Sequence, residues 1–462
     1  MPFLAFFVVL IPLVIIHELG HFFAAKSVRI TVLEFGIGFP PRIAKLFTIG
    51  DTEYTLNWIP LGGFVRPYGE DFVRPKSEEE MQEDLKEIEG RHIENPKSVF
   101  DAGPWERIWF MFAGPLANFI AAIFFFMVIG LTGIPKTIGE VSLAEVFPDS
   151  PAAAAGLQDG DVVTHVDGVV VESVEEFEDA TNGKDTLNLT IKRGDESFDA
   201  VVTPAPFEGG GVEERVLVIE YLTDSPAGRA GIQLDDLIIA LEGEPIKNIE
   251  DLQKKTQARE GQETAYTILR GNETLVLTMT PVEIDGTARI GVTITGAPLD
   301  ENMGAITANR SVEVKPEPAD NLWEAFKYGL SSFQNAIETM FEVPSMLARG
   351  ELSWAEARPV SIVGISQFGG EVIKYSRDEG VWYPILSLIG LISIALAVTN
   401  LLPIPGLDGG RILFVIIELL RGKPMEPERE GFVHMIGILF LLSLMVIVVF
   451  WDIIDPLNYK IF

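Results

Sequence analysis

The chain has 462 residues, a formal net charge of -32 and no cysteine, yet its mean hydropathy is +0.26. So much charge is compatible with a positive mean hydropathy only if the apolar residues are segregated into blocks, as in a membrane protein with acidic soluble parts. The negative charge argues against a nucleic-acid partner, and the absence of cysteine excludes disulfides and thiolate zinc sites.

The first apolar block runs from Phe3 to Ala25 and contains His17-Glu-Leu-Gly-His21. On a helix the two histidines lie one turn apart on one face, and Glu18 lies about 100° further round. This is the His-Glu-x-x-His arrangement of zinc hydrolases, in which the glutamate is the general base. Ionisable groups inside a span cost about 2.5–3.5 kcal/mol each, and metal coordination would offset that cost. A signal peptide and a buried structural histidine pair are the alternatives.

Three further apolar blocks, residues 108–131, 382–402 and 432–451, are long enough to span a membrane. Lysine and arginine are frequent in the loop after the first block and in the loop between the last two. The positive-inside tendency therefore places both loops in the cytoplasm and the acidic residues 135–380 outside.

Residues 30–67 predict a β-hairpin or a small sheet. Residues 52–59 have the pattern of a strand, Pro60 marks a turn, and residues 61–65 can return as a second strand. The segment is apolar enough to dip into the membrane beside the first helix, where an exposed edge can pair with an extended peptide. A plain cytoplasmic hairpin is the alternative. The candidate substrate-binding residues are Gly62, Gly63 and Phe64.

The second block opens with Ala113-Gly-Pro-Leu-Ala-Asn118. Gly114 and Ala117 permit close approach of another helix, whereas Asn118 is a polar group that needs a partner in the membrane. We expect Asn118 to make an interhelical packing hydrogen bond.

An internal repeat lies between the second and third blocks. Asp149-Ser-Pro-Ala-Ala-Ala-Ala-Gly156 recurs 75 positions later as Asp224-Ser-Pro-Ala-Gly-Arg-Ala-Gly231, and each copy continues with an acidic turn and a strand. The pattern resembles PDZ domains, which implies two α+β domains that bind peptide ends or control access. Ile290-Gly-Val292 is suited to cradling a peptide end, but the corresponding strand Arg215–Glu220 has no glycine. Peptide-end binding by the first copy is therefore not expected.

The third block ends in Thr399-Asn-Leu-Leu-Pro-Ile-Pro-Gly-Leu-Asp-Gly-Gly410. Its two prolines break the helix and leave Asp408 near the cytoplasmic side, at the depth of His21. A catalytic zinc normally has three protein ligands and an open position, so His17, His21 and Asp408 are predicted to hold one Zn²⁺ per chain. Asn400 is placed to donate to a substrate carbonyl or oxyanion, or alternatively to cap the broken helix.

These features predict an α-helical polytopic membrane protein of about four transmembrane helices, with a membrane-associated β-hairpin and two α+β PDZ-like domains. Leu322–Met346 is expected to be an amphipathic helix on the exterior membrane surface. The predicted segments are the first transmembrane helix (1–29), the β-hairpin region (30–68), a charged cytoplasmic linker (69–103), the second transmembrane helix (104–134), PDZ-like domains 1 (135–220) and 2 (221–300), a linker with the amphipathic helix (301–380), the third transmembrane helix (381–421), and the fourth with the C-terminus (422–462).

The two motifs and the paired repeats between them resemble the site-2 protease family, in particular its tandem-PDZ branch of regulators of sigma-E protease. The resemblance implies an intramembrane zinc metalloendopeptidase of the bacterial inner membrane. Its substrates would be single-pass transmembrane proteins, such as anti-sigma factors, already cut outside by another protease. Its partners would be these substrates, the lipid bilayer and a peptide ligand of the PDZ-like domains.

Two other classes of protein fit part of the pattern. A membrane metal transporter or sensor can use the same ligands, but it needs a second polar path, which the other three spans do not offer. A non-catalytic PDZ scaffold would need neither Glu18 nor Asp408.

Overall fold

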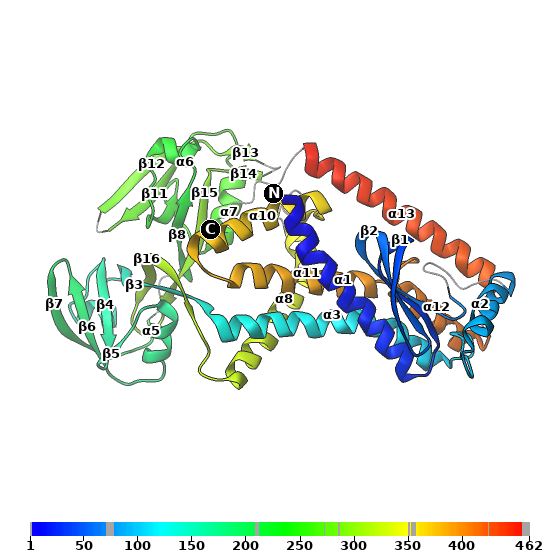
Figure 1. Ribbon diagram of the computed structural model, residues 1–462. Helices are drawn as coiled ribbons and strands as arrows, with labels where there is room; N and C mark the ends of the chain where they lie inside the picture. Colours follow the sequence, from blue (N-terminus) through cyan, green and yellow to red (C-terminus); the bar gives the residue numbers. More distant parts are fainter. Residues whose placement is uncertain are drawn as a thin grey trace. The chain divides into compact units, whose positions relative to one another are not determined.

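The computed structural model describes residues 2–70, 78–207, 212–271, 273–284, 287–349, 352, 357–423 and 425–454. Residues 1–134, 316–342 and 359–462 form one compact unit (unit 1), and residues 135–315 and 343–358 form another (unit 2). Unit 1 contains the long helices and a hairpin, and unit 2 contains most of the strands (Figure 1).

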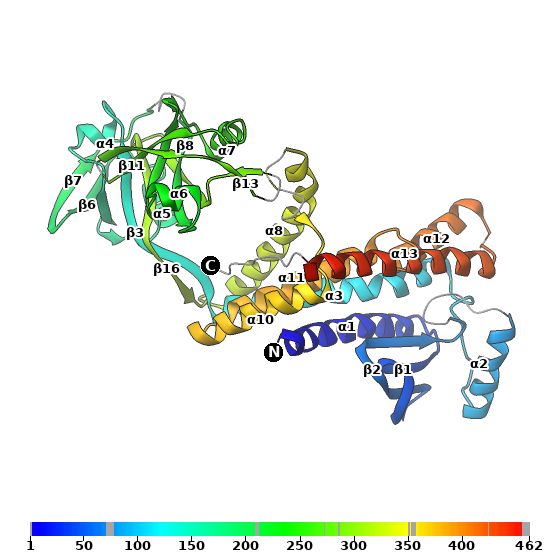
Figure 2. The same ribbon diagram turned by 90° about the horizontal axis from the view of Figure 1, so that it is seen from above.

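Unit 1 is built on four helices that are long and apolar enough to cross a membrane, counted among the described residues. They coincide with the four predicted apolar blocks and are α1 (Pro2–Ser27), α3 (Pro104–Thr132), α11 (Tyr383–Leu401) and α13 (Pro427–Ile454). Helix α3 packs against both α1 and α11 (Figure 2). A Cβ on Gly20 would lie 2.3 Å from Ala113 O, so this glycine allows the backbones of α1 and α3 to approach closely.

The β-hairpin is formed by β1 (Val32–Ile49) and β2 (Thr52–Pro67), which lie beside α1 (Figure 2). The prediction that residues 52–59 and 61–65 are two strands separated at Pro60 is wrong, because β2 continues through this position and the strands reverse at Gly50-Asp51. Both halves of β2 pair with β1, since Phe35 is paired with Val65 and also with Tyr54. The first residues of β1 are buried, and the two halves of β2, one on each side, satisfy their backbone groups.

The segment predicted as a charged linker contains a helix, α2 (Glu78–Arg91). Arg66 of β2 donates to Asp84 at 3.1 Å and to Glu87 at 2.8 Å, which ties α2 to the hairpin. Residues 71–77 of the predicted linker lie outside the described residues.

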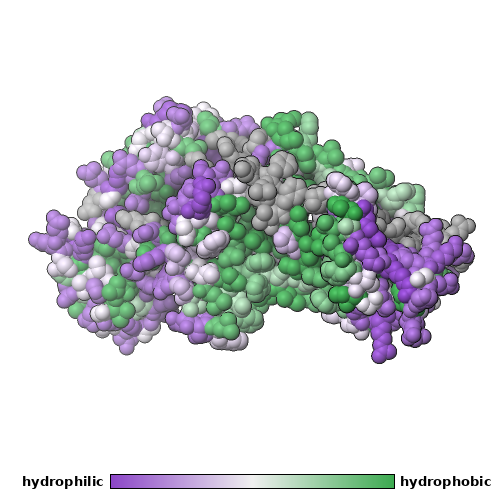
Figure 3. All heavy atoms as spheres, viewed as in Figure 1, coloured by the Kyte–Doolittle hydropathy of each residue, from purple (hydrophilic) through white to green (hydrophobic). Residues whose placement is uncertain are grey.

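The remaining helices of unit 1 begin with α8 (Leu322–Arg349), which includes all of the residues predicted as an amphipathic helix and extends into unit 2. It is followed by α10 (Ile362–Glu379) and α12 (Asp408–Arg421). Trp323 of α8 is 64% exposed. Over α1 and α3, the surface of unit 1 is largely hydrophobic (Figure 3), as expected for helices that face lipid.

Unit 2 contains both copies of the internal repeat. The first copy includes β3 (Ile134–Val146), α4 (Pro151–Ala154), β4 (Asp161–Val166), β5 (Val169–Val170), α5 (Val174–Thr181), β6 (Leu187–Arg193) and β7 (Glu196–Val202). The second includes β8 (Glu214–Tyr221), α6 (Pro226–Ala230), β9 (Leu237–Leu241), β10 (Glu244–Pro245), α7 (Ile249–Gln257), β11 (Thr264–Arg270), β12 (Glu273–Met279), β13 (Val282–Ile284), β14 (Thr287–Arg289) and β15 (Val292–Asp300). Strand β16 (Ala305–Glu317) follows and lies between β15 and β3 in the sheet.

The second repeat is inserted into the first. The hydrophobic core of the first repeat includes Met303 and Ala305, which follow the whole second repeat in the sequence. Strand β8, in contrast, contributes Val216 and Val218 to the core of the second repeat. The predicted domain boundaries at 220 and 300, and the prediction of a linker from residue 301, are therefore wrong.

Equivalent hydrogen bonds close the two repeats. Ala152 N donates to Met303 O at 2.9 Å, and Ala227 N donates to Ile290 O at 2.9 Å. Gly304, with φ +65°, thus corresponds to Gly291, with φ +82°. The prediction that the first copy lacks this glycine is wrong, because the glycine comes after the second copy and not before it.

Each repeat also contains a buried aspartate that binds an arginine with two hydrogen bonds. Arg193 donates to Asp161 at 2.6 and 2.7 Å, and Arg270 donates to Asp236 at 2.7 and 2.7 Å. Both carboxylates are completely buried. The two interactions hold the turn before β4 or β9 against the end of β6 or β11.

Candidate active site

His17 and His21 lie one turn apart on α1, as the helical spacing predicts. Their Nε2 atoms are 3.1 Å apart, and both side chains are buried. Two imidazoles that face each other at this distance can share one metal ion.

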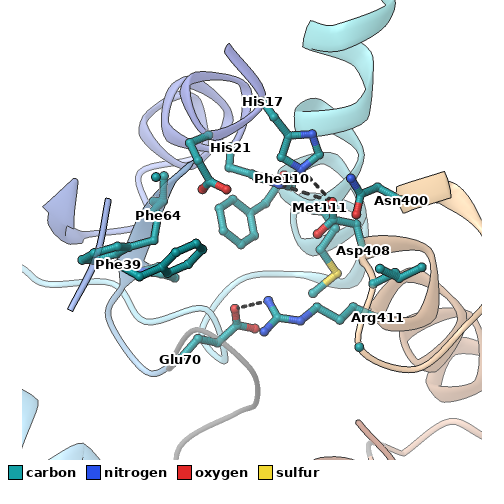
Figure 4. Close-up of a pocket in the computed structure, with 16 residues that line it drawn as sticks. His17, His21, Phe39, Phe64, Glu70, Phe110, Met111, Asn400, Asp408 and Arg411 are labelled. Atoms are coloured by element: carbon teal, nitrogen blue, oxygen red, sulfur yellow. Dashed lines mark hydrogen bonds and ion pairs between the residues drawn. The ribbon is translucent and has the colours of Figure 1, made fainter. Parts of the chain in front are cut away.

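Asp408 joins the two histidines from the first residue of α12, 391 positions after His17. Its Oδ2 atom lies 3.1 Å from His17 Nε2 and 3.4 Å from His21 Nε2, and the three candidate ligand atoms lie within 4.8 Å of one another. Figure 4 shows these side chains meeting from α1 and from the start of α12. The prolines before Asp408 end α11 and allow this approach.

Backbone and side-chain groups of α3 orient both imidazoles. His21 Nδ1 lies 2.8 Å from Phe110 O, so Nδ1–H donates to this carbonyl and Nε2 faces Asp408. Asn118 lies on the other side, with its Nδ2 atom 3.3 Å from His17 Nδ1. The expected interhelical contact of Asn118 is therefore present, and its partner is one of the two motif histidines.

The residues around the cluster fit a zinc ion. Two imidazole nitrogens and a carboxylate oxygen are the ligand types of catalytic zinc sites. Gly114 of α3 leaves the space open, because a Cβ there would lie 2.3 Å from His21 Nε2 and 2.8 Å from His17 Nε2. Any larger side chain at Gly114 would fill the place where the ligand atoms converge.

Glu18 lines a cavity of about 320 Å³ together with His17, His21 and Asp408. The hairpin forms one wall, since a Cβ on Gly63 would lie 3.5 Å from Glu18 Cγ. The other lining residues are Phe39, Phe64, Val65, Pro67, Glu70, Phe110, Met111, Asn400, Gly406, Leu407 and Arg411.

The remaining predicted site residues differ in their placement. Gly63 and Phe64 line the cavity, whereas Gly62 lies against Val14, to which a Cβ would come within 2.9 Å. Asn400 also lines the cavity, and its Nδ2 donates to Leu396 O of its own helix at 3.0 Å.

The cavity wall also contains an ion pair that was not predicted from the sequence. Arg411 Nη1 lies 3.1 Å from Glu70 Oε2 (Figure 4). Burial raises the pKa of Glu70, and the charge of Arg411 opposes that shift. Arg411 follows Asp408 by three positions on α12, so helical spacing is a signal by which its presence near the cavity can be predicted.

Asp408 lies outside the spanning segments. Burial favours its neutral form, but the charge of His21 and the hydrogen bond from His17 outweigh burial and hold the pKa of Asp408 well below its usual range. The carboxylate is therefore the form available to a metal.

Comparison with known proteins gives relatives along nearly the whole chain. The chain is 29% identical to the regulator of sigma-E protease RseP of Salmonella typhimurium and 27% identical to that of Escherichia coli, with 97% of each chain covered in both cases. It is 26% identical to the zinc metalloprotease RasP of Oceanobacillus iheyensis, over 96% of both chains.

Solved structures of PDZ domains match short parts of the chain. The PDZ domain of an SdrC-like protein from Listeria monocytogenes is 22% identical, with 17% of this chain and 86% of that chain covered and a TM-score of 0.16. The HtrA3 PDZ domain bound to a phage-derived ligand is 24% identical, with 16% and 83% covered and a TM-score of 0.15.

The family model described as peptidase family M50 matches residues 5–444, which include both motifs of the cavity. The match and the relatives above agree with a cluster of zinc-type ligands whose two histidines lie on a helix of spanning length. The chain therefore belongs to peptidase family M50, the site-2 proteases, and is an intramembrane zinc metalloendopeptidase.

Proposed function

We propose that this enzyme cuts the transmembrane segments of single-pass membrane proteins, such as anti-sigma factors, after another protease has removed their exterior part. One observation carries the proposal: His17, Glu18 and His21, which line the cavity, lie on α1, a helix apolar enough to lie in the bilayer. A peptide bond cut there lies within the membrane.

In this proposal His17, His21 and Asp408 hold one zinc ion, with Nε2 of each imidazole and a carboxylate oxygen as ligands. Zinc, when bound, supplies a Lewis acid that polarises a carbonyl and lowers the pKa of water toward about 7. Glu18 accepts the proton of the attacking water and later donates it to the leaving amine.

Asn400 is the proposed donor to the carbonyl oxygen of the cut bond. Its amide bonds to Leu396 O in this structure, and one Nδ2 proton remains available because a primary amide carries two. That proton would stabilise the charge that develops on the substrate oxygen.

The substrate segment must be extended before it is cut, because a helix hides its carbonyl groups in hydrogen bonds. Residues 63–65 of β2 line the cavity next to Glu18. We place the extended substrate along this part of the hairpin, where main-chain hydrogen bonds replace those of its helix.

The two repeats of unit 2 are proposed to be tandem PDZ domains on the exterior side, with the zinc site toward the cytoplasmic side. Two features support this: each repeat has a positive-φ glycine, Gly304 or Gly291, at the equivalent place, and basic residues are frequent in the two loops assigned to the cytoplasm. The PDZ pair would then control access by excluding substrates that still carry a folded exterior part.

Co-expression with tagged single-pass substrates tests the proposal. Each substrate is supplied in a full-length form and in a form truncated outside the membrane. We expect cleavage of the truncated form within its transmembrane segment, located by mass spectrometry, and little cleavage of the full-length form. Cleavage only in soluble regions, or equal cleavage of both forms, would contradict the proposal.

A further inference from the structure

His434 is a buried histidine in the fourth spanning helix that the proposed reaction does not use. Its side chain is completely buried, although α13 has the least buried window of the four candidate spans. Its Nδ1 atom accepts a hydrogen bond of 2.8 Å from the backbone N–H of Gly406. Because Nδ1 is the acceptor, the imidazole is neutral and carries its proton on Nε2.

Burying an imidazole at this position costs more free energy than burying an apolar side chain, if the residue serves packing alone. His434 Nε2 is buried and has no hydrogen-bond partner among the described residues; Glu430 Oε1 is 3.8 Å away, beyond hydrogen-bond range. A buried polar atom without a partner costs about 1–3 kcal/mol, which a leucine of similar volume would avoid. The bond to Gly406 is the hydrogen bond that the imidazole gains, and its ring also packs against Phe414 of α12, with 5.1 Å between the ring centroids.

The next turn of α13 contacts the same loop through its backbone. A Cβ on Gly437 would lie 1.8 Å from Pro405 O, and a Cβ on Gly406 would lie 2.8 Å from Ile438 Cγ1. Gly406 itself has φ +100°. One turn of α13 thus holds a loop whose backbone has a conformation that favours glycine.

This loop leads directly into Asp408, the first residue of α12. Gly406 precedes Asp408 by two residues and, with Leu407, lines the same cavity. The prolines at 403 and 405 have no N–H to donate, so few backbone donors remain by which the loop can be fixed. The hydrogen bond from Gly406 to His434 is one of them.

We propose that His434 is a positioning residue: it fixes the loop from Pro403 to Leu407 so that the Asp408 carboxylate meets His17 and His21. The inference rests on the proposed ligand set and adds α13 to the elements that build the site. Groups that orient a ligand typically contribute 10–100-fold to metal affinity or activity. His434 acts through a loop and not on a ligand directly, so we expect an effect of about tenfold.

The test compares three variants of the full chain in detergent. His434→Leu keeps the volume and removes the acceptor, whereas His434→Asn keeps an acceptor at the Nδ1 position, since asparagine Oδ1 is placed like histidine Nδ1. Met435→Leu is the matched control, because Met435 lies next in the sequence and is 48% exposed. The readouts are the rate of zinc release to a chelator, and kcat and KM on a cleaved substrate.

We expect His434→Leu to release zinc about ten times faster and to lower kcat about tenfold at an unchanged KM. His434→Asn and Met435→Leu should behave like wild type. Zinc release from His434→Leu at the wild-type rate would overturn the proposal. Zinc release from His434→Asn as fast as from His434→Leu would overturn it too. If His434→Leu does not fold, as judged by circular dichroism, His434→Asn is compared with His434→Gln, which places its acceptor one atom further out and should release zinc faster.

Zinc release requires no substrate, so this result is separate from the proposed substrate class. A wrong substrate class leaves the difference between His434→Leu and wild type in place. A wild-type chain that binds no zinc would overturn both the ligand set and the role of His434.

Discussion

His17 on α1 and Asn118 on α3 contact each other through polar atoms, with 3.3 Å between His17 Nδ1 and Asn118 Nδ2. Asn118 Oδ1 is buried without a hydrogen-bond partner among the described residues. The two ends of an amide have nearly the same shape, and exchanging them places Oδ1 where it accepts Nδ1–H of His17. Asn118 Oδ1 would then accept the Nδ1 proton of His17, as Phe110 O accepts that of His21. Both hydrogen bonds leave the Nε2 atom of the imidazole available to the metal.

Asn118→Leu tests this role. We expect about 10–100-fold weaker zinc retention, since the His17 ring loses the acceptor that fixes its tautomer and orientation. Asn118→Asp retains an acceptor oxygen and should retain zinc better than the leucine variant. Phe124→Leu is the control, because Phe124 lies on the same helix and is 53% exposed. Zinc content after dialysis measures the effect, and equal content in all variants would show that Asn118 only packs.

Gly114→Ala adds only a methyl group, but we expect it to disrupt the site severely. The new Cβ would lie 2.3 Å from His21 Nε2, which is closer than any allowed contact. One imidazole must therefore leave the cluster, and we expect loss of bound zinc and of cleavage. Gly90→Ala on α2 is the matched control, since a Cβ there meets nothing within 4 Å. Normal zinc content in Gly114→Ala would contradict the geometry described for α3.

Local spacing was enough to predict half of the site. The helical period placed His17 and His21 together, and the Pro-Ile-Pro break brought Asp408 to the same depth. Local spacing could not predict that Asn118 and His434 are neighbours of the site, because each contacts a segment that is remote in the sequence. Which face of α3 or α13 meets that segment depends on packing.

The repeats show a second limit of the sequence. The 75-residue offset identified both copies, but the strand that closes the first one follows the second. A search at a fixed offset cannot find Gly304, since only 13 positions separate it from Gly291. The pattern apolar–Gly–apolar at Met303-Gly-Ala305 and Ile290-Gly-Val292 was the available signal. The strands of the hairpin were predicted wrongly for a similar reason. Both halves of β2 pair with the buried first part of β1, and this pairing depends on burial, which local spacing does not show.

The inserted topology predicts which amides respond to Asp161→Asn. Breaking its charged hydrogen bonds to Arg193 should cost about 2 kcal/mol, a value kept low because the arginine side chain is 37% exposed. Hydrogen exchange should rise in β4, β6 and also around Met303. Asp236→Asn should instead raise exchange in β9 and β11. Asp199→Asn, on the edge of the first repeat, is the control. An unchanged rate at Met303 in Asp161→Asn would contradict the assignment of that segment to the first repeat.

Protonation of Asp167 at low pH should lower the stability of one turn of the first repeat. Hydrogen bonds from Lys184 and Asn188 lower the pKa of Asp167 to about 2 from an ordinary value of 3.8. Since the folded pKa is below the unfolded one, the stabilisation is present above about pH 4 and is lost as the pH falls toward about 2. The difference in exchange between wild type and Asp167→Ala should therefore shrink over this range. A difference that stays constant with pH would show that ionisation of Asp167 contributes nothing.

The central claim is that Glu18 is the base of a zinc peptidase and not a ligand, and Glu18→Gln tests it most directly. Zinc content and cleavage of a truncated single-pass substrate are measured on the same purified samples, before and after chelation. The account predicts that wild type holds one zinc and cleaves, and that chelation abolishes cleavage until zinc is restored. Glu18→Gln should hold one zinc and show no cleavage. Cleavage by Glu18→Gln at the wild-type rate would contradict the account.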